Sequence, residues 1–455
     1  MKKYFNFALY FALGFFALFE CDSFFGTVSQ TVFTVENEYL VYGISCFAAM
    51  VGVAIFLVFR RVKKTVRQVL LFFGFMCAAA APMAAYIFQN ALIFWTSLIV
   101  FYIAEGLNTA VCAFCLYKIK EKDTNIKTGL LLAVTSSLGL ILNYAADFLF
   151  ESMLIFKTAL LSTTILIMMF IAFKRIDMVN TAAEREQIAE DKSRKYKKNY
   201  LPILFTVTAS IAIISYMIGV NDVAIFTALL SNPNGEFFWP QLLYIPALLI
   251  AGLLADVKNG KFLSIAMFGC TLLTAPSVLR LSSPEDFAGY SGMAFFLGGF
   301  YLVYSMTGLL SIAGRGKFPA LVTSTSAFVF FLFSGVGAFT SSKYFREDGV
   351  FSLTVFIGLS VLLLVVFYLS GSLQPISAEQ WQPIVPEKKL LENYGFTNRE
   401  KEVLQLLLDG HSTADIAEKM TVTEKTIYKY ISALLSKTGK SSRASMLVMF
   451  NTKES

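Results

Sequence analysis

Residues 350–389 read VFSLTVFIGLSVLLLVVFYLSGSLQPISAEQWQPIVPEKK, and the character of the chain changes within this stretch. Its first half is an apolar run of about 20 residues, the length that an α-helix needs to cross a bilayer. Its second half is polar and contains Pro375, Pro383 and Pro386, as is typical of a linker. The stretch therefore predicts a membrane domain at 1–370, a linker at 371–391 and a further domain at 392–455.

Apolar runs of the same kind fill the chain before residue 370. The 455-residue chain is 56% hydrophobic and only 15% charged, whereas soluble domains carry about 25% charged residues. The runs are continuous rather than alternating, which favours helices over a β-barrel. We predict an all-α protein with twelve membrane-spanning helices, at 4–20, 39–59, 68–88, 91–117, 129–150, 153–173, 201–219, 237–255, 262–279, 289–313, 319–341 and 350–370.

Lysine and arginine gather on one side of this predicted bundle. If the N-terminus is inside, the inner connections hold basic clusters at 60–67, 118–127 and 174–198, and the outer ones hold only Lys157, Arg280, Lys343 and Arg346. The predicted first outer loop, at 20–38, is acidic. Because basic residues favour the cytoplasmic side, we expect a multi-pass protein of the cytoplasmic (inner) membrane with both termini in the cytoplasm.

The longest inner connection, 174–198, follows the sixth predicted span, so the bundle divides into six plus six helices. The loop after the eighth span reads GLLADVKNGK at 252–261. It resembles the inner-loop signature of the major facilitator superfamily, in which Gly252 would allow close helix approach and Asp256 would cap a helix end. Val257 stands where that family has a basic residue, and Gly260 comes one position late. These departures count against transport activity.

The C-terminal residues 396–450 predict four short amphipathic helices. Thr397 and Glu400 form a capping box for the first helix. Ser412 would cap a second at 413–420, and a tight turn at 421–422 leads to a third at 424–437, which Thr423 would cap and Gly439 would end. The fourth is expected at 443–450. Two helices around a tight turn, with a basic outward face on the later one, predict a helix-turn-helix.

A close family resemblance rests on 396–410 (FTNREKEVLQLLLDG), 412–420 (STADIAEKM), 422–427 (VTEKTI), 437–439 (KTG) and 442–444 (SRA). This pattern resembles the LuxR-type DNA-binding domain. The resemblance implies that the third helix enters the major groove and that the fourth dimerises. Tyr430 stands where that family often has a histidine.

The helical phase of the third predicted helix separates its inner and outer faces. With Ile427, Ile431 and Leu434 inward, Tyr428 and Lys429 face outward and are the candidates for base contacts. Thr426, Lys437, Lys440 and Arg443, on or just after the third helix, suit contacts with phosphates. The candidate DNA-binding residues are Lys425, Thr426, Tyr428, Lys429, Ser432, Lys437, Lys440 and Arg443. The alternative is that the lysines only solvate an exposed helix. One copy would bind double-stranded DNA weakly, which favours a homodimer on an operator with two half-sites.

Polar groups inside predicted spans mark a candidate ligand site, because they are costly in a bilayer. Glu105 lies near the middle of the fourth span. In the major facilitator superfamily the first, fourth, seventh and tenth spans line a central cavity, which would bring Tyr10 close to several of these groups. The candidate ligand-binding residues are Tyr102, Glu105, Asn108, Tyr216, Tyr301 and Tyr304, and they would suit a small polar or aromatic molecule. Alternatively, the tyrosines are packing residues, and Glu105 is protonated or bonded to a neighbouring span.

These features lead to one functional hypothesis with an alternative. The chain is expected to be a membrane-bound one-component transcription regulator that senses a small-molecule effector and binds DNA. The alternative is a secondary transporter with an attached regulatory domain. We expect no enzyme, cofactor, metal site or catalytic residue, because the chain has a single histidine, His411, and no nucleophile–base set or phosphate loop.

Overall fold

The computed structural model describes residues 4–33, 38–59, 62–122, 126–150, 153–173, 200–231, 238–257, 260–274, 287–313, 319–341, 349–369, 394–408, 413–439 and 446. The predicted linker at 371–391 and the inner connection at 174–198 lie outside these residues. The chain divides into two compact units, Met1–Leu373 and Gln374–Ser455. Regular secondary structure in the described residues is helical, which confirms the all-α class.

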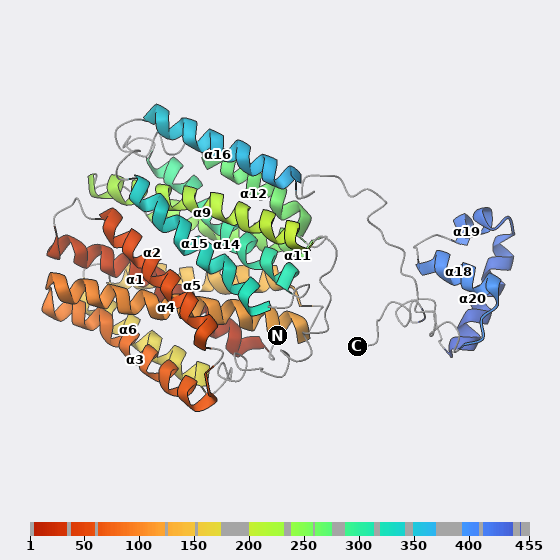
Figure 1. Cartoon of the computed structure of the whole chain (residues 1–455), viewed down its shortest axis with the longest axis horizontal. Coiled ribbons are helices and arrows are strands. Elements are labelled where there is room, and N and C mark those ends of the chain that lie inside the picture. The colour runs from red at the N-terminus through yellow and green to blue at the C-terminus, as the bar shows by residue number, and fades with distance from the viewer. Residues whose placement is uncertain are drawn as a thin grey trace. The chain divides into compact units, whose positions relative to one another are not determined.

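The first unit is a bundle of long apolar helices (Figure 1). They are α1 Phe5–Val32, α2 Glu38–Phe59, α3 Lys64–Phe88, α4 Ala91–Lys122, α5 Thr128–Phe150, α6 Leu154–Ile171, α9 Tyr200–Ser231, α10 Phe238–Leu242, α11 Tyr244–Asp256, α12 Lys261–Thr274, α14 Phe287–Ala313, α15 Pro319–Thr340 and α16 Gly349–Leu369. Nine of the described helices are long and apolar enough to cross a membrane, and shorter apolar stretches lie at Pro240–Asp256, Phe262–Thr274 and Thr354–Tyr368. Each predicted span therefore coincides with helical structure, while the count of twelve crossings stays a prediction.

The helices of the bundle form two sets with equivalent internal packing. In the first set α2 packs on α4, α1 on α5, and α3 on both α4 and α6. In the second set α11 packs on α14, α9 on α15, and α12 on both α14 and α16. The sets meet where α2 packs on α15 and where α5 packs on α11. This equivalence shows two similar halves, as the sequence predicts, while six crossings in each half stay a prediction.

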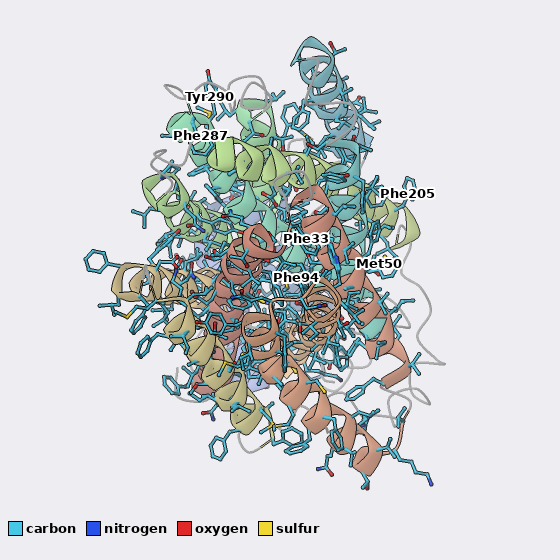
Figure 2. The ribbon with its side chains drawn as sticks, turned by 90° about the vertical axis from the view of Figure 1, so that its left-hand side faces the viewer. Phe33, Met50, Phe94, Phe205, Phe287 and Tyr290 are labelled. Atoms are coloured by element: carbon cyan, nitrogen blue, oxygen red, sulfur yellow. The ribbon has the colours of Figure 1, made fainter. Side chains whose placement is uncertain are left out.

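The outer surface of the bundle is apolar. Phe205 is 74% exposed and Val58 is 66% exposed, and Figure 2 shows Phe205 at the edge of the bundle. Inside, the side chains of different helices interlock, as where the rings of Phe33 and Phe94 lie with centroids 5.3 Å apart. Large apolar side chains on the outside of helices that satisfy their own backbone hydrogen bonds suit a lipid environment. The unit is a multi-pass membrane domain.

Close helix approach depends on glycine at two contacts. A methyl group at Gly106 of α4 would collide with the carbonyl oxygen of Ala49 in α2. At the contact of α5 with α11, a Cβ at Gly252 would lie 2.7 Å from the carbonyl oxygen of Gly129. The carboxylate of Asp256 accepts backbone hydrogen bonds from Gly129 at 3.0 Å and from Leu130 at 2.8 Å. Both roles expected of the 252–261 motif, close approach and helix capping, are confirmed.

The first helix differs from its prediction. Helix α1 runs to Val32 instead of ending near residue 20, so residues 20–32 do not form part of an outer loop. Glu20 is fully buried. The helix continues because its acidic side chains have partners on other helices: Asn143 donates to Glu20 at 2.9 Å, and the Tyr102 hydroxyl donates to Asp22.

Other span boundaries also differ. Helix α9 continues to Ser231, beyond the predicted end at 219. The predicted continuous span at 237–255 is divided into α10 and α11 around Leu243. Pro246 explains the division, because it has no backbone N–H for the carbonyl of Leu242 and its ring crowds that carbonyl. The ninth span ends, among the described residues, at Thr274.

The second unit holds α18 Asn398–Leu408, α19 Thr413–Lys419 and α20 Glu424–Thr438. These helices enclose a core that includes Leu404, Ile416, Ile427 and Leu434. Met446 is also buried in this core, while the remainder of the predicted fourth helix at 443–450 lies outside the described residues. The order and bounds of the first three helices agree with the prediction.

Capping in the second unit is local and largely as predicted. The backbone N–H of Thr397 donates to Glu400 at 2.7 Å, and that of Glu400 donates to the Thr397 hydroxyl at 3.3 Å, which confirms the capping box. Gly439 ends α20 with φ 64°. Thr423 occupies the N-cap position of α20, but its hydroxyl lies 2.9 Å from that of Thr426 and caps no backbone N–H.

Candidate functional site

A cavity of about 940 Å³ lies inside the helical bundle. Both helix sets contribute to its wall, with residues from α1, α2, α4, α5 and α6 on one side and from α9, α10, α11, α14 and α15 on the other. Cavities of this size hold small organic ligands, usually against apolar walls with a few placed polar groups. The position between the two sets is the one at which a bound molecule can contact both.

The structure brings four of the six predicted ligand-binding residues to this cavity. Tyr102, Glu105, Asn108 and Tyr301 line it. Tyr10 lies behind the wall, and its hydroxyl donates a hydrogen bond to the side-chain oxygen of Asn108. Asn108 is thereby held in place by the first helix.

The other two predicted residues are not among the lining residues, so the prediction that they share the cavity is wrong. The Tyr216 hydroxyl accepts a hydrogen bond from Thr340 at 2.9 Å. The Tyr304 ring is buried and lies 5.9 Å, centroid to centroid, from that of Phe367 in α16. Tyr304 lies one helical turn beyond Tyr301 on the same side of α14, but its ring packs against α16 and does not line the cavity.

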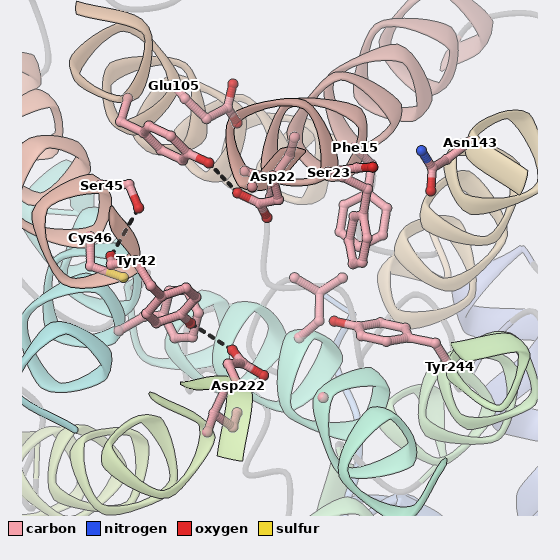
Figure 3. Close-up of a pocket in the computed structure, with 18 of the residues that line it drawn as sticks. Phe15, Asp22, Ser23, Tyr42, Ser45, Cys46, Glu105, Asn143, Asp222 and Tyr244 are labelled. Atoms are coloured by element: carbon pink, nitrogen blue, oxygen red, sulfur yellow. Dashed lines mark hydrogen bonds between the residues drawn. The ribbon is translucent and has the colours of Figure 1, made fainter. Parts of the chain in front are cut away.

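Two tyrosine–aspartate hydrogen bonds face each other across the cavity (Figure 3). The Tyr102 hydroxyl of α4 donates to Asp22 of α1. The Tyr42 hydroxyl of α2 donates to Asp222 of α9 at 2.6 Å. Asp22 and Tyr42 are not among the site residues predicted from the sequence. For Asp22 the reason is that residues 20–38 are predicted to be a loop. The spacing of Asp22 from Phe15 and Phe19, which places the three on one helical face, could have indicated its position.

Further polar groups line the cavity beside these pairs. The Thr109 hydroxyl donates to Glu105 at 3.3 Å within α4. Lys157 of α6 forms an ion pair with Asp147 of α5 at 2.5 Å. The cavity thus contains several carboxyl groups, of which one has a basic partner among the described lining residues.

Aromatic rings form another part of the wall. The Tyr244 ring of α11 meets those of Phe15 and Phe19 of α1 edge to face, with centroids 6.2 and 5.7 Å apart. Figure 3 shows Phe15 and Tyr244 on the same side of the cavity, across from Tyr42 and Cys46. Such rings present a π-face to a ligand and resist rearrangement through their mutual contact.

The second unit carries the candidate DNA contacts on α20. Lys425, Lys429 and Ser432 are exposed, and Tyr428 is 57% exposed. Thr426 is half-buried. Ile427, Ile431 and Leu434 are buried, as the phase predicts. Lys440 and Arg443 lie outside the described residues.

Lys437 has a partner within its own domain. Its ammonium lies 2.7 Å from the carboxylate of Glu400 and donates to the carbonyl of Gly395 at 3.2 Å. Burial alone would raise the pKa of Glu400, but the hydrogen bonds from Lys437 and Thr397 lower that pKa below its ordinary value of 4.5. This pair links the start of α18 to the end of α20.

Comparison with known proteins agrees with this geometry in the second unit. Residues 395–450 match the family described as "Bacterial regulatory proteins, luxR family". Over 57 residues the chain is 39% identical to the transcriptional regulatory protein DesR of Bacillus subtilis (strain 168). That match covers 12% of this chain and 29% of DesR, so the chain spans less than a third of that relative's length. Residues 395–450 are a LuxR-type helix-turn-helix DNA-binding domain.

The larger unit is similar to a solved transporter. The crystal structure of the human organic anion transporter MFSD10 (TETRAN) aligns with a TM-score of 0.48 and 14% sequence identity, over 81% of this chain and 98% of that one. A likeness of this degree says nothing of what this chain binds. The equivalent packing of the two helix sets shows, independently of this likeness, that the bundle has two similar halves.

Proposed function

We propose that this protein is a membrane-bound one-component transcription regulator. Its membrane domain, 1–370, senses a small organic molecule in the central cavity, and its domain at 392–455 binds a double-stranded DNA operator. The observation that carries the proposal is the presence in one chain of a ligand-sized cavity of about 940 Å³ and a LuxR-type DNA-binding domain. A DNA-binding domain on a membrane protein has a use only if the membrane part controls it or positions it.

The cavity wall suggests how a ligand would act. Asp22 belongs to the first helix set and Asp222 to the second, so a ligand that bridges them favours one arrangement of the two sets. A ligand shifts such an equilibrium only by its difference in affinity between the two arrangements. The linker at 371–391 reaches about 20–30 Å if flexible, so DNA binding takes place near the bilayer.

DNA binding is proposed to run through the exposed face of α20, with Tyr428 and Lys429 at base edges and Lys425, Thr426 and Ser432 beside them. Lys440 and Arg443 remain proposed phosphate contacts. Lys437 is a weaker candidate, because its ammonium already pairs with Glu400. A homodimer on two half-sites would double the area of contact with DNA. We further propose that the protein lies in the cytoplasmic membrane with both termini in the cytoplasm.

Mapping chromosomal sites that crosslink to the full chain tests the regulator function. We expect a small set of discrete sites for the wild type and their loss in Lys429→Ala at equal membrane abundance. If the same chromosomal sites are enriched with the wild type and with Lys429→Ala, or if none is enriched with either, the assignment of DNA binding to this face of α20 is refuted. A reporter fused after Ser455 should be active only in the cytoplasm.

The alternative is a secondary transporter with an attached regulatory domain, and the six-plus-six bundle around a central cavity favours it. The two functions differ in a liposome assay with the effector that neighbouring genes suggest. A sensor changes the affinity of the full chain for its operator without accumulating the molecule. A transporter accumulates it, and Glu105→Gln abolishes the accumulation.

A further inference from the structure

The charges around the central cavity are unbalanced. The described residues that line it include the acids Asp22, Glu105, Asp147 and Asp222 but one base, Lys157. Lys157 pairs with Asp147 at 2.5 Å. Asp22, Glu105 and Asp222 therefore face the cavity without a basic partner among the described lining residues.

The groups that donate to these three carboxyls are neutral. Tyr102 donates to Asp22, Tyr42 donates to Asp222, and both Thr109 and the side chain of Asn108 bond to Glu105. Neutral donors orient a carboxylate and leave its charge uncompensated. In a low-dielectric wall an uncompensated charge is costly, and a ligand of opposite charge removes that cost.

A second, independent observation points to a ligand at the same place. Asn221 lines the cavity next to Asp222 and is 1% exposed, yet neither its side-chain nitrogen nor its oxygen has a hydrogen-bond partner. A buried amide without partners costs about 1–3 kcal/mol. An occupant with a polar group near Asp222 would supply the missing hydrogen bond.

The remaining wall specifies the body of the ligand. Phe15, Phe19 and Tyr244 present an aromatic surface, and aromatic faces attract cations as well as apolar groups. A metal ion does not fit this arrangement, because no three His, Cys, Asp or Glu side chains in the described part of the chain lie in a metal-binding group. Dispersed carboxyls around about 940 Å³ suit a large, diffuse charge.

We infer that the central cavity binds a hydrophobic organic cation, whose positive charge lies among Asp22, Glu105 and Asp222 and whose apolar body packs on Phe15, Phe19 and Tyr244. This inference rests on the proposed function, since it names the class of molecule that the cavity senses. Neutral ligands would leave the carboxyls uncompensated, and anions would be repelled by them.

The test uses the full chain in nanodiscs of zwitterionic phosphatidylcholine and two probes of nearly the same shape and opposite charge, tetraphenylphosphonium and tetraphenylborate. Binding is measured by equilibrium dialysis, with empty nanodiscs subtracted. We expect saturable binding of the cation and none of the anion. Asp22→Asn and Asp222→Asn should each weaken cation binding at least tenfold, whereas Asp22→Glu, which keeps the charge, should stay within threefold of the wild type.

Glu121→Gln is the matched control, because Glu121 lies in α4 but is not among the cavity-lining residues, and it should leave cation binding unchanged. Equal saturable binding of both probes, or unchanged cation binding in the two asparagine variants, overturns the inference. The comparison of the two probes uses only the wild-type protein, so its result does not depend on whether a variant folds.

Titration of the same nanodiscs with operator DNA separates the two proposals. A cation that binds without changing the affinity for the operator refutes sensing and leaves the cation site standing. If the protein binds its operator but does not bind the cation, only the proposed class of ligand is refuted.

Discussion

Asp256, the last residue of α11, accepts a backbone hydrogen bond at 3.0 Å from Gly129, the second residue of α5. A second bond from Leu130 at 2.8 Å completes a cap on the positive end of α5. The two helices belong to different sets of the bundle. The cap therefore joins the sets at one of their two largest contacts, and an arrangement of the bundle that separates α5 from α11 must break it.

We expect Asp256→Ala to weaken this junction. Hydrogen bonds to a charged group contribute about 1.5–3 kcal/mol each, so the loss of two should lower the free energy of unfolding by about 3–6 kcal/mol. The melting temperature measured in detergent should fall with it. Val257→Ala, at the neighbouring exposed position, is the control and should melt like the wild type. Equal melting of both variants would show that the cap contributes nothing.

Gly106→Ala should disrupt the contact of α4 with α2. The added methyl group collides with the carbonyl oxygen of Ala49, a backbone atom that cannot move alone. Overpacking of this kind costs about 1–3 kcal/mol. Gly74→Ala is the matched control: no atom lies within 4 Å of its added methyl group, and the variant gains helix propensity of up to about 1 kcal/mol. Thermal melting of the two variants should move in opposite directions.

Lys429→Ala should weaken operator binding by the purified protein about tenfold or more, because a base-edge contact is worth about 1–3 kcal/mol. Fluorescence anisotropy against the mapped operator and a scrambled duplex measures this loss. A base contact predicts a larger loss on the operator than on the scrambled DNA. Lys401→Ala, which removes the same charge from α18, should change affinity less than twofold, and equal losses in both variants would make the role of Lys429 a general charge effect.

Glu400→Gln should destabilise the DNA-binding domain by about 1–2 kcal/mol at neutral pH, because the capping box and the ion pair with Lys437 are both weakened. The lowered pKa of Glu400 means that the folded domain holds this proton less tightly than the unfolded chain does. Its stabilisation is therefore present above pH 4.5 and is lost as the pH falls through the folded pKa.

Urea unfolding of residues 392–455 between pH 3 and 7 measures this dependence. The wild type should lose stability in the acid range and Glu400→Gln should lose less. Glu402→Gln breaks only the exposed pair with Arg399 at 3.3 Å, and it should change stability by less than about 0.5 kcal/mol. An identical pH dependence in wild type and Glu400→Gln contradicts the role of this carboxylate.

Features that depend on neighbours in the chain could be predicted from the sequence. The helices follow from continuous apolar runs, and the capping box of Thr397 and Glu400 is fixed by spacing alone. The end of α1 could not be predicted in this way. Glu20 and Asp22 interrupt an apolar run, and the helix continues because these acids bond to Asn143 and Tyr102, which are distant in the sequence.

The candidate ligand site shows the same division. Tyr102, Glu105 and Asn108 share a face of one helix, so helical phase places them together correctly. Tyr216 and Tyr304 are predicted to face the cavity because of the spans on which they lie. Whether a side chain on such a span faces the cavity depends on the rotation of the helix about its axis. That rotation depends on packing against α15 and α16, which the sequence does not express locally.

The buried acids of α1 affect how the chain enters the membrane. A helix that carries Glu20 and Asp22 is poorly stable in lipid by itself, and its partners Asn143 and Tyr102 are synthesised later, in α5 and α4. We therefore expect α1 to become stable in lipid only after α4 and α5 have been made, because those helices supply its hydrogen-bond partners.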